Sequence, residues 1–122
     1  MEHKELTRAA CIAECLALWE WVAQTGIHKA EWPEWERVRR EYNLLFAGWC
    51  PFCEYANSQV RNTYDRCGYC PYYKHFGHTC MDPRSPYLDI VDLGITKERV
   101  NAFLEQLREI PVEKEATNEV QS

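Results

Sequence analysis

Apolar residues recur at helical spacing over residues 4–25, while polar residues such as Thr7 and Glu14 lie on or near the opposite side. Alanine and leucine are frequent in this stretch, and both favour helix formation. Gly26 follows at the position where a left-handed C-terminal cap is expected. The apolar arc is wide, so we expect the rest of the molecule to cover this helix on most sides.

Two further stretches predict helices. The first runs from about 33 to 47, with Pro33 in its first turn and Gly48 after its end. The second begins after Thr96, a good N-cap, and ends before Pro111. Between them, residues 87–91 fit either a short extended segment or a turn of helix. The apolar positions that support the two helices are Trp35, Val38, Tyr42 and Leu45, and Val100, Phe103, Leu104 and Leu107.

These patterns predict a mainly α-helical protein with one domain over residues 1–110. Residues 1–48 form a helical hairpin in this interpretation, and residues 95–110 form a C-terminal helix. An irregular cysteine-rich segment over 49–84 connects them, held by zinc in the manner of a zinc ribbon or knuckle. Residues 111–122 are acidic and without periodicity, and we expect a mobile tail there.

Composition limits the class of protein. The 122 residues are 46% hydrophobic and 27% charged, as in soluble globular domains. No apolar run approaches the ~20 residues of a membrane span, and the charged start does not resemble a signal peptide, so we expect a cytoplasmic protein. The net charge of −5 repels phosphate backbones and disfavours non-specific binding to nucleic acid.

Seven cysteines are the most informative feature of the sequence. An odd count without a secretion signal favours metal binding over a disulfide framework. Four of them form two Cys-x-x-Cys pairs separated by thirteen residues, and two such pairs can hold one zinc ion in a closed tetrahedral site. We therefore predict a structural Zn²⁺ bound by Cys50, Cys53, Cys67 and Cys70.

Other side chains compete for this role or lie near it. Cys80 is an alternate ligand, or else a buried apolar residue. His75 and His78 are expected at the surface or beside the ligands rather than among them. Cys11 and Cys15 share one face of the first helix, which is compatible with metal binding, but small core residues are the preferred interpretation.

Three functional classes remain open. The sequence contains no recognisable catalytic constellation, so we expect a protein-binding module rather than an enzyme. A module that binds single-stranded nucleic acid is the first alternative. A thioredoxin-like dithiol around Cys50 and Cys53 is the second, although the residues before it continue a helical pattern instead of a strand. The side chains for the nucleic-acid alternative are Arg61, Arg66, Tyr72, Tyr73 and Lys74.

Several motifs together resemble a group of small zinc-binding proteins of tailed bacteriophages. The motifs are Trp32-Pro33-Glu34-Trp35, then Cys50-Pro51-Phe52-Cys53-Glu54-Tyr55-Ala56, then Cys67-Gly68-Tyr69-Cys70-Pro71 through Cys80. The resemblance covers about residues 10–80. It implies an accessory protein of the host cytoplasm that binds or inhibits a host or defence protein. It carries over the cysteines as ligands and no catalytic residue.

Overall fold

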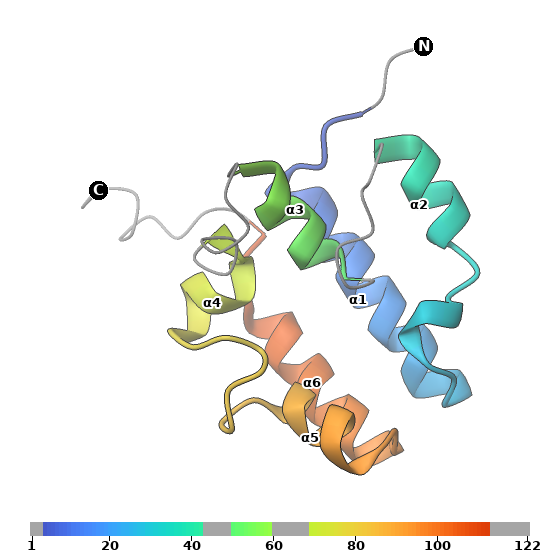
Figure 1. The fold of residues 1–122 in the computed structure, drawn as a ribbon, viewed down its shortest axis with the longest axis vertical. Helices are drawn as coiled ribbons and strands as arrows, with labels where there is room; N and C mark the ends of the chain where they lie inside the picture. The colour runs from blue at the N-terminus through green and yellow to red at the C-terminus, as the bar shows by residue number, and fades with distance from the viewer. Residues whose placement is uncertain (1–3, 43–49, 60–68, 113–122) are drawn as a thin grey trace.

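A computed structural model describes residues 4–42, 50–59 and 69–112 (Figure 1). These three segments are mainly helical and contain no β-strand, which confirms the mainly α-helical class. None of the helices found in them is long and apolar enough to cross a bilayer. The elements are α1 (Arg8–Thr25), the 3-10 turn η1 (Lys29–Glu31), α2 (Trp35–Tyr42), α3 (Pro51–Gln59), α4 (Pro71–Phe76), α5 (Pro86–Leu93) and α6 (Lys97–Glu109).

Helix α1 is the longest of these and lies at the centre of the fold, packed against α3 and α6 (Figure 1). It begins at Arg8, later than the predicted residue 4, because the Thr7 side chain caps it by accepting a hydrogen bond from the Ala10 N–H at 3.1 Å. It ends at Gly26, whose φ of 71° gives the left-handed cap that the sequence predicted.

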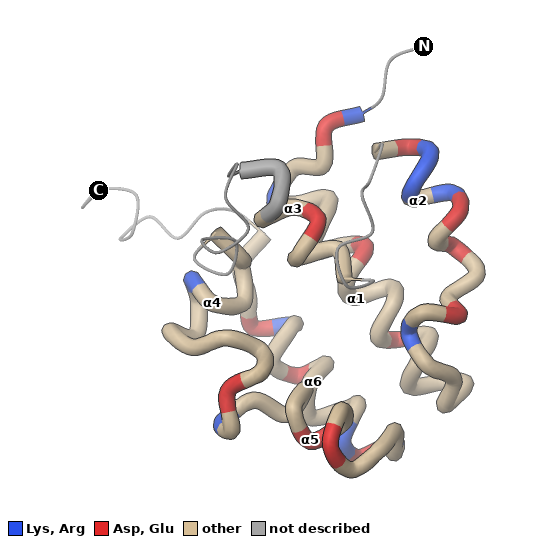
Figure 2. Tube along the Cα trace, viewed as in Figure 1, with Lys and Arg blue, Asp and Glu red and all other residues tan. Residues whose placement is uncertain are grey.

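Helix α2 begins at Trp35, two residues after the predicted start at Pro33. Its predicted continuation to residue 47 lies outside the described residues. Trp35 and Val38 are buried, and an ion pair between Arg37 and Glu14 (2.9 Å) joins α2 to α1. Helix α2 carries both acidic and basic residues along its length (Figure 2).

The C-terminal helix agrees with its prediction. The Thr96 hydroxyl accepts a hydrogen bond from the Arg99 N–H at 3.2 Å, and α6 ends at Glu109, just before Pro111. Residues 87–91, for which two structures were open, belong to α5. Helices α5 and α6 pack against each other. The predicted tail is described only at residues 111–112, so its mobility stays a prediction.

The segment predicted to be irregular over 49–84 contains two short helices where the structure describes it, α3 and α4, while residues 77–84 form turns and bends as expected of an irregular segment. Each helix begins with a proline that directly follows a cysteine, Pro51 after Cys50 and Pro71 after Cys70. Proline suits the first turn of a helix, since its φ is already helical and no amide hydrogen is lost from the helix ladder. Each Cys-Pro pair therefore marks a helix start.

The core gathers around the inner face of α1 and includes an aromatic cluster. Trp19 and Phe103 meet edge to face at 5.1 Å between ring centroids, and Tyr87 lies 5.7 Å from Trp19 and 5.4 Å from Phe103. Tyr72 joins the cluster at 5.9 Å from Phe103. These rings connect α1 with α4, α5 and α6 and form one wall of the cavity described next.

Candidate metal centre

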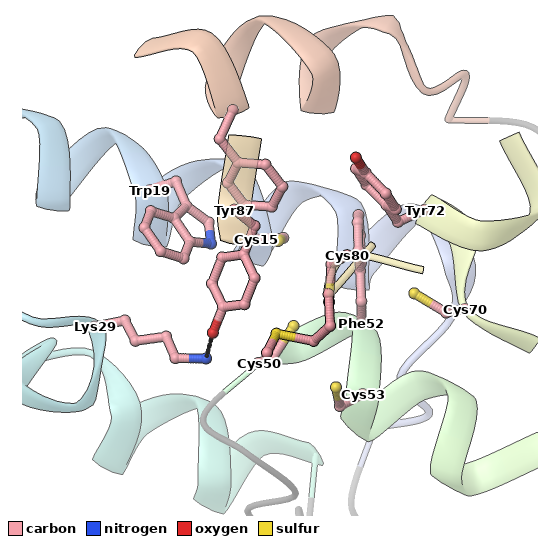
Figure 3. A pocket seen from close by; sticks show the side chains of 12 residues that line it. Cys15, Trp19, Lys29, Cys50, Phe52, Cys53, Cys70, Tyr72, Cys80 and Tyr87 are labelled. Carbon is pink, nitrogen blue, oxygen red and sulfur yellow. Dashed lines mark hydrogen bonds between the residues drawn. The ribbon is translucent and has the colours of Figure 1, made fainter. Parts of the chain in front are cut away.

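A cavity of about 180 Å³ lies between α1, α3 and α4 and contains five thiols in its lining (Figure 3). Its other lining residues are mostly apolar or aromatic. The cysteines are Cys15, Cys50, Cys53, Cys70 and Cys80, and the remaining residues are Trp19, Lys29, Phe52, Tyr72, Met81, Tyr87 and Phe103. Residues from four separate parts of the chain thus contribute thiols to the lining of one cavity.

Helix starts position three of these thiols. The Cys50 carbonyl accepts a hydrogen bond from the Glu54 N–H at 3.0 Å, so Cys50 caps α3, and Cys53 follows in the first turn. The Cys70 carbonyl likewise accepts from the Lys74 N–H at 3.0 Å at the start of α4. The proline after each capping cysteine fixes the local backbone, which restricts where the thiol can lie.

The thiols differ strongly in acidity. Hydrogen bonds with the Cys15 and Cys53 thiols lower the pKa of Cys50 well below its usual range, and the Lys29 ammonium acts in the same direction. The same pairing with Cys50 raises the pKa of Cys53. Burial raises the pKa of Cys15 and raises that of Cys70 to about 12. Among Cys15, Cys50, Cys53 and Cys70, only Cys50 has its pKa lowered.

Lys29 and Tyr87 line the side of the cavity away from Cys53 and Cys70 (Figure 3). The Lys29 ammonium donates a hydrogen bond to the Tyr87 hydroxyl at 2.8 Å and lies 5.0 Å from the centroid of that ring. Lys29 is partly buried, and a nearby cation favours the charged form of a thiol. Lys29 thus supplies positive charge beside the group of sulfur atoms.

The structure brings together most of the predicted ligands. Cys50, Cys53 and Cys70 line the cavity with the alternate ligand Cys80, while Cys67 lies outside the described residues. Neither predicted neighbouring histidine lines the cavity: His75 contacts the Phe76 ring, and His78 contacts the rings of Tyr72 and Phe76.

Cys15 and Lys29 are the lining residues that the sequence interpretation did not assign to the site. Cys15 is buried, as predicted for a core residue, but it also lines the cavity and is hydrogen-bonded to Cys50. The sequence feature that could have indicated a role for Cys15 was its four-residue spacing from Cys11, which places both thiols on one helix face. No sequence pattern indicated that Lys29 lines the site, because its position depends on the conformation of the chain between α1 and η1.

Tyr72 is unavailable for stacking on a nucleic-acid base. Its ring is fully buried, and its hydroxyl donates a hydrogen bond to Gln106 Oε1 at 2.5 Å and shares another with Ser85 Oγ at 3.0 Å. Tyr73 and Lys74 are exposed on α4, whereas Arg61 and Arg66 lie outside the described residues. One of the two tyrosines required for the nucleic-acid alternative is therefore a core residue.

The lining chemistry suits zinc, which takes four thiolate ligands in structural sites. Five thiols are present in a lining that is otherwise mostly apolar or aromatic. Within the described ranges, no group of three or more His, Cys, Asp or Glu side chains has the geometry to hold a metal ion. The sulfur atoms line one cavity without converging on one point.

Comparison of the chain with family models, curated proteins and solved structures finds no match.

Proposed function

We propose that this chain is a zinc-stabilised helical module that acts by binding another protein. The observation that carries the proposal is the presence of five cysteine thiols, from four parts of the chain, in the lining of one largely apolar cavity. Thiolates are the ligands that structural zinc prefers, and such sites contribute directly to folding. The resemblance of about residues 10–80 to small phage zinc proteins supports the same class.

Zinc in this cavity would act as a scaffold. Cys50, Cys53 and Cys70 are the described ligands from the predicted set, with Cys80 as the alternate. The bound ion would hold the starts of α3 and α4 in place. Helix α3 packs on both α1 and α4, so an ion bound by these cysteines would tie the start of α4 to α1 through α3.

Helix α5 is the part of the surface best suited to bind a protein. Val91 is 50% exposed and Leu93 is 63% exposed, although both are large apolar residues. Val91 also lines a groove that His28 and Ile95 border. Exposed apolar side chains beside a groove are typical of protein-binding surfaces. A host or defence protein is the partner that the phage resemblance implies.

The test is capture of a partner from a bacterial lysate with two matched variants. The double variant Val91→Asp with Leu93→Asp should lose the partner that the native chain retains. Asp92→Asn, at another exposed position of α5, should keep it. Zinc content is measured for each variant, so that loss of capture is read only from folded, metal-loaded protein. Equal capture by all three proteins, or no capture by the native chain, contradicts the protein-binding role.

A dithiol oxidoreductase is the second candidate, because Cys50 has a lowered pKa and caps the start of α3. In such an enzyme the Cys50 thiolate attacks a disulfide of the substrate, and Cys53 then resolves the mixed disulfide. Alkylation separates the two functions. If Cys50 reacts in the metal-loaded protein, the oxidoreductase is favoured; if it reacts only after chelation, the zinc scaffold is favoured.

A further inference from the structure

Helix α1 carries two buried cysteines one turn apart, and only one of them reaches the cavity. Cys15 lines it, whereas Cys11 does not. The Cys11 thiol instead donates a hydrogen bond to the Arg8 carbonyl at 3.3 Å, within its own helix. Both residues are buried cysteines of α1. They differ in that only Cys15 lines the cavity with the other thiols.

Cys15 lies directly against the predicted ligands. Helix α1 packs on α3, and Cys15 lines the same cavity as Cys50 and Cys53, close enough to Cys50 to lower the pKa of that thiol. Two thiolates on one tetrahedral zinc lie about 3.8 Å apart, since each Zn–S bond is about 2.3 Å long. Both thiols line one cavity, so an ion bound there by Cys15 and Cys50 would draw their sulfur atoms to that separation.

We propose that Cys15 is a zinc ligand, which joins α1 to the cysteine-rich segment through the metal. This inference rests on the proposed zinc site and adds a ligand that neither Cys-x-x-Cys pair contains. Cys15, Cys50 and Cys53 then contribute three of the four sulfurs, and the fourth comes from Cys70 or Cys80. The central helix of the core and the start of α3 are held by the same ion.

Two variants test the assignment in the full chain, with zinc affinity measured by competition against a chelator. Cys15→Ser should weaken zinc binding by at least about 100-fold, the share expected of one ligand in a four-ligand site. Cys11→Ser should leave the affinity within about threefold, because that thiol bonds only its own helix. With Co²⁺ in place of zinc, the sulfur-to-metal absorption should fall in Cys15→Ser and stay unchanged in Cys11→Ser.

A second measurement uses the native sequence and does not depend on whether a variant folds. The zinc-loaded chain is treated with an alkylating reagent, with and without chelator, and each cysteine is followed by peptide mass mapping. Cys15 should become reactive together with Cys50 when the metal is removed, ahead of Cys11. Simultaneous reaction of Cys15 and Cys11, or equal zinc affinity of their serine variants, overturns the assignment. If the native chain binds no zinc at all, the proposed function itself fails.

Discussion

Cys50 is the residue whose surroundings differ most from those of an ordinary cysteine. It caps α3, is hydrogen-bonded to two other thiols and is affected by the charge of Lys29. A zinc ion with four thiolates carries a net charge of −2, which is costly to bury without a compensating cation. Lys29 is therefore expected to stabilise the loaded site without binding the metal.

Lys29→Met tests this role by removing the charge and keeping most of the side-chain volume. Zinc affinity should fall by roughly tenfold, because a charge pair in such surroundings contributes on the order of 1 to 4 kcal/mol. Competition with a chelator measures the change. Lys97→Met, at an exposed position of α6, is the control and should bind zinc like the native protein. Equal affinity of the two variants would show that Lys29 has no electrostatic role.

The acidities of the thiols predict how zinc binding depends on pH. In the metal-free protein Cys15, Cys53 and Cys70 have raised pKa values, about 12 for Cys70, so these thiols hold their protons at neutral pH. Zinc binds thiolates and must release those protons, so its affinity should rise with pH and fall on acidification. We expect at least about a tenfold loss per pH unit, measured by chelator competition. An affinity that stays constant as the pH is lowered contradicts thiolate binding.

At the scale of the elements, Tyr72 fixes how α4 meets α5 and α6. Its hydroxyl bonds Gln106 in α6 and Ser85, and the Ser85 hydroxyl also accepts the Tyr87 N–H at 3.2 Å and so caps α5. The buried ring occupies the space between these helices. One side chain therefore sets the packing of three elements.

Removing the hydroxyl in Tyr72→Phe should lower the free energy of unfolding by about 1 to 3 kcal/mol, since the buried Ser85 hydroxyl and the half-buried Gln106 amide each lose a hydrogen bond. Urea unfolding of the zinc-loaded protein measures the change. Tyr73→Phe, one residue along α4 and exposed, should change it by less than about 0.5 kcal/mol. Similar losses in both variants would mean that the Tyr72 hydrogen bonds do not stabilise the fold.

Stretches with several turns of apolar spacing could be predicted as helices, whereas α3 and α4 could not, and α5 was one of two open alternatives. The stretches that became α1 and α6 contain several turns of apolar spacing and well-marked ends at Gly26 and Thr96. Helices α3, α4 and α5 have nine residues or fewer, too few for a clear period. Their prolines after Cys50, Cys70 and Ser85 were the usable signal, because proline favours the first turn of a helix.

The candidate site could likewise be predicted only where it depends on local sequence spacing. Cys50, Cys53 and Cys70 could be predicted because their spacing is local, and the structure places them in one cavity. Cys15 and Lys29 join them through packing of α1 and the turn after it, which sequence spacing does not report. Residues brought to the site by packing between distant parts of the chain could not be predicted from sequence spacing.

In the molecule as a whole, the proposed zinc site lies beside the aromatic cluster rather than apart from it. Trp19, Tyr72 and Phe103 belong both to the core and to the cavity lining. Loss of the metal should therefore disturb α3 and α4 and also the packing of α1 against its neighbours. A metal site on a separate loop would leave that packing intact.

Native mass spectrometry of the full chain, with and without a chelator, tests the zinc scaffold most directly when each sample is also melted. We predict that the purified protein carries bound zinc, and that chelation removes this mass and abolishes or greatly lowers the cooperative thermal transition. A protein that carries no metal, or that melts identically after losing it, would contradict the account, as would a mass showing the cysteines joined as disulfides.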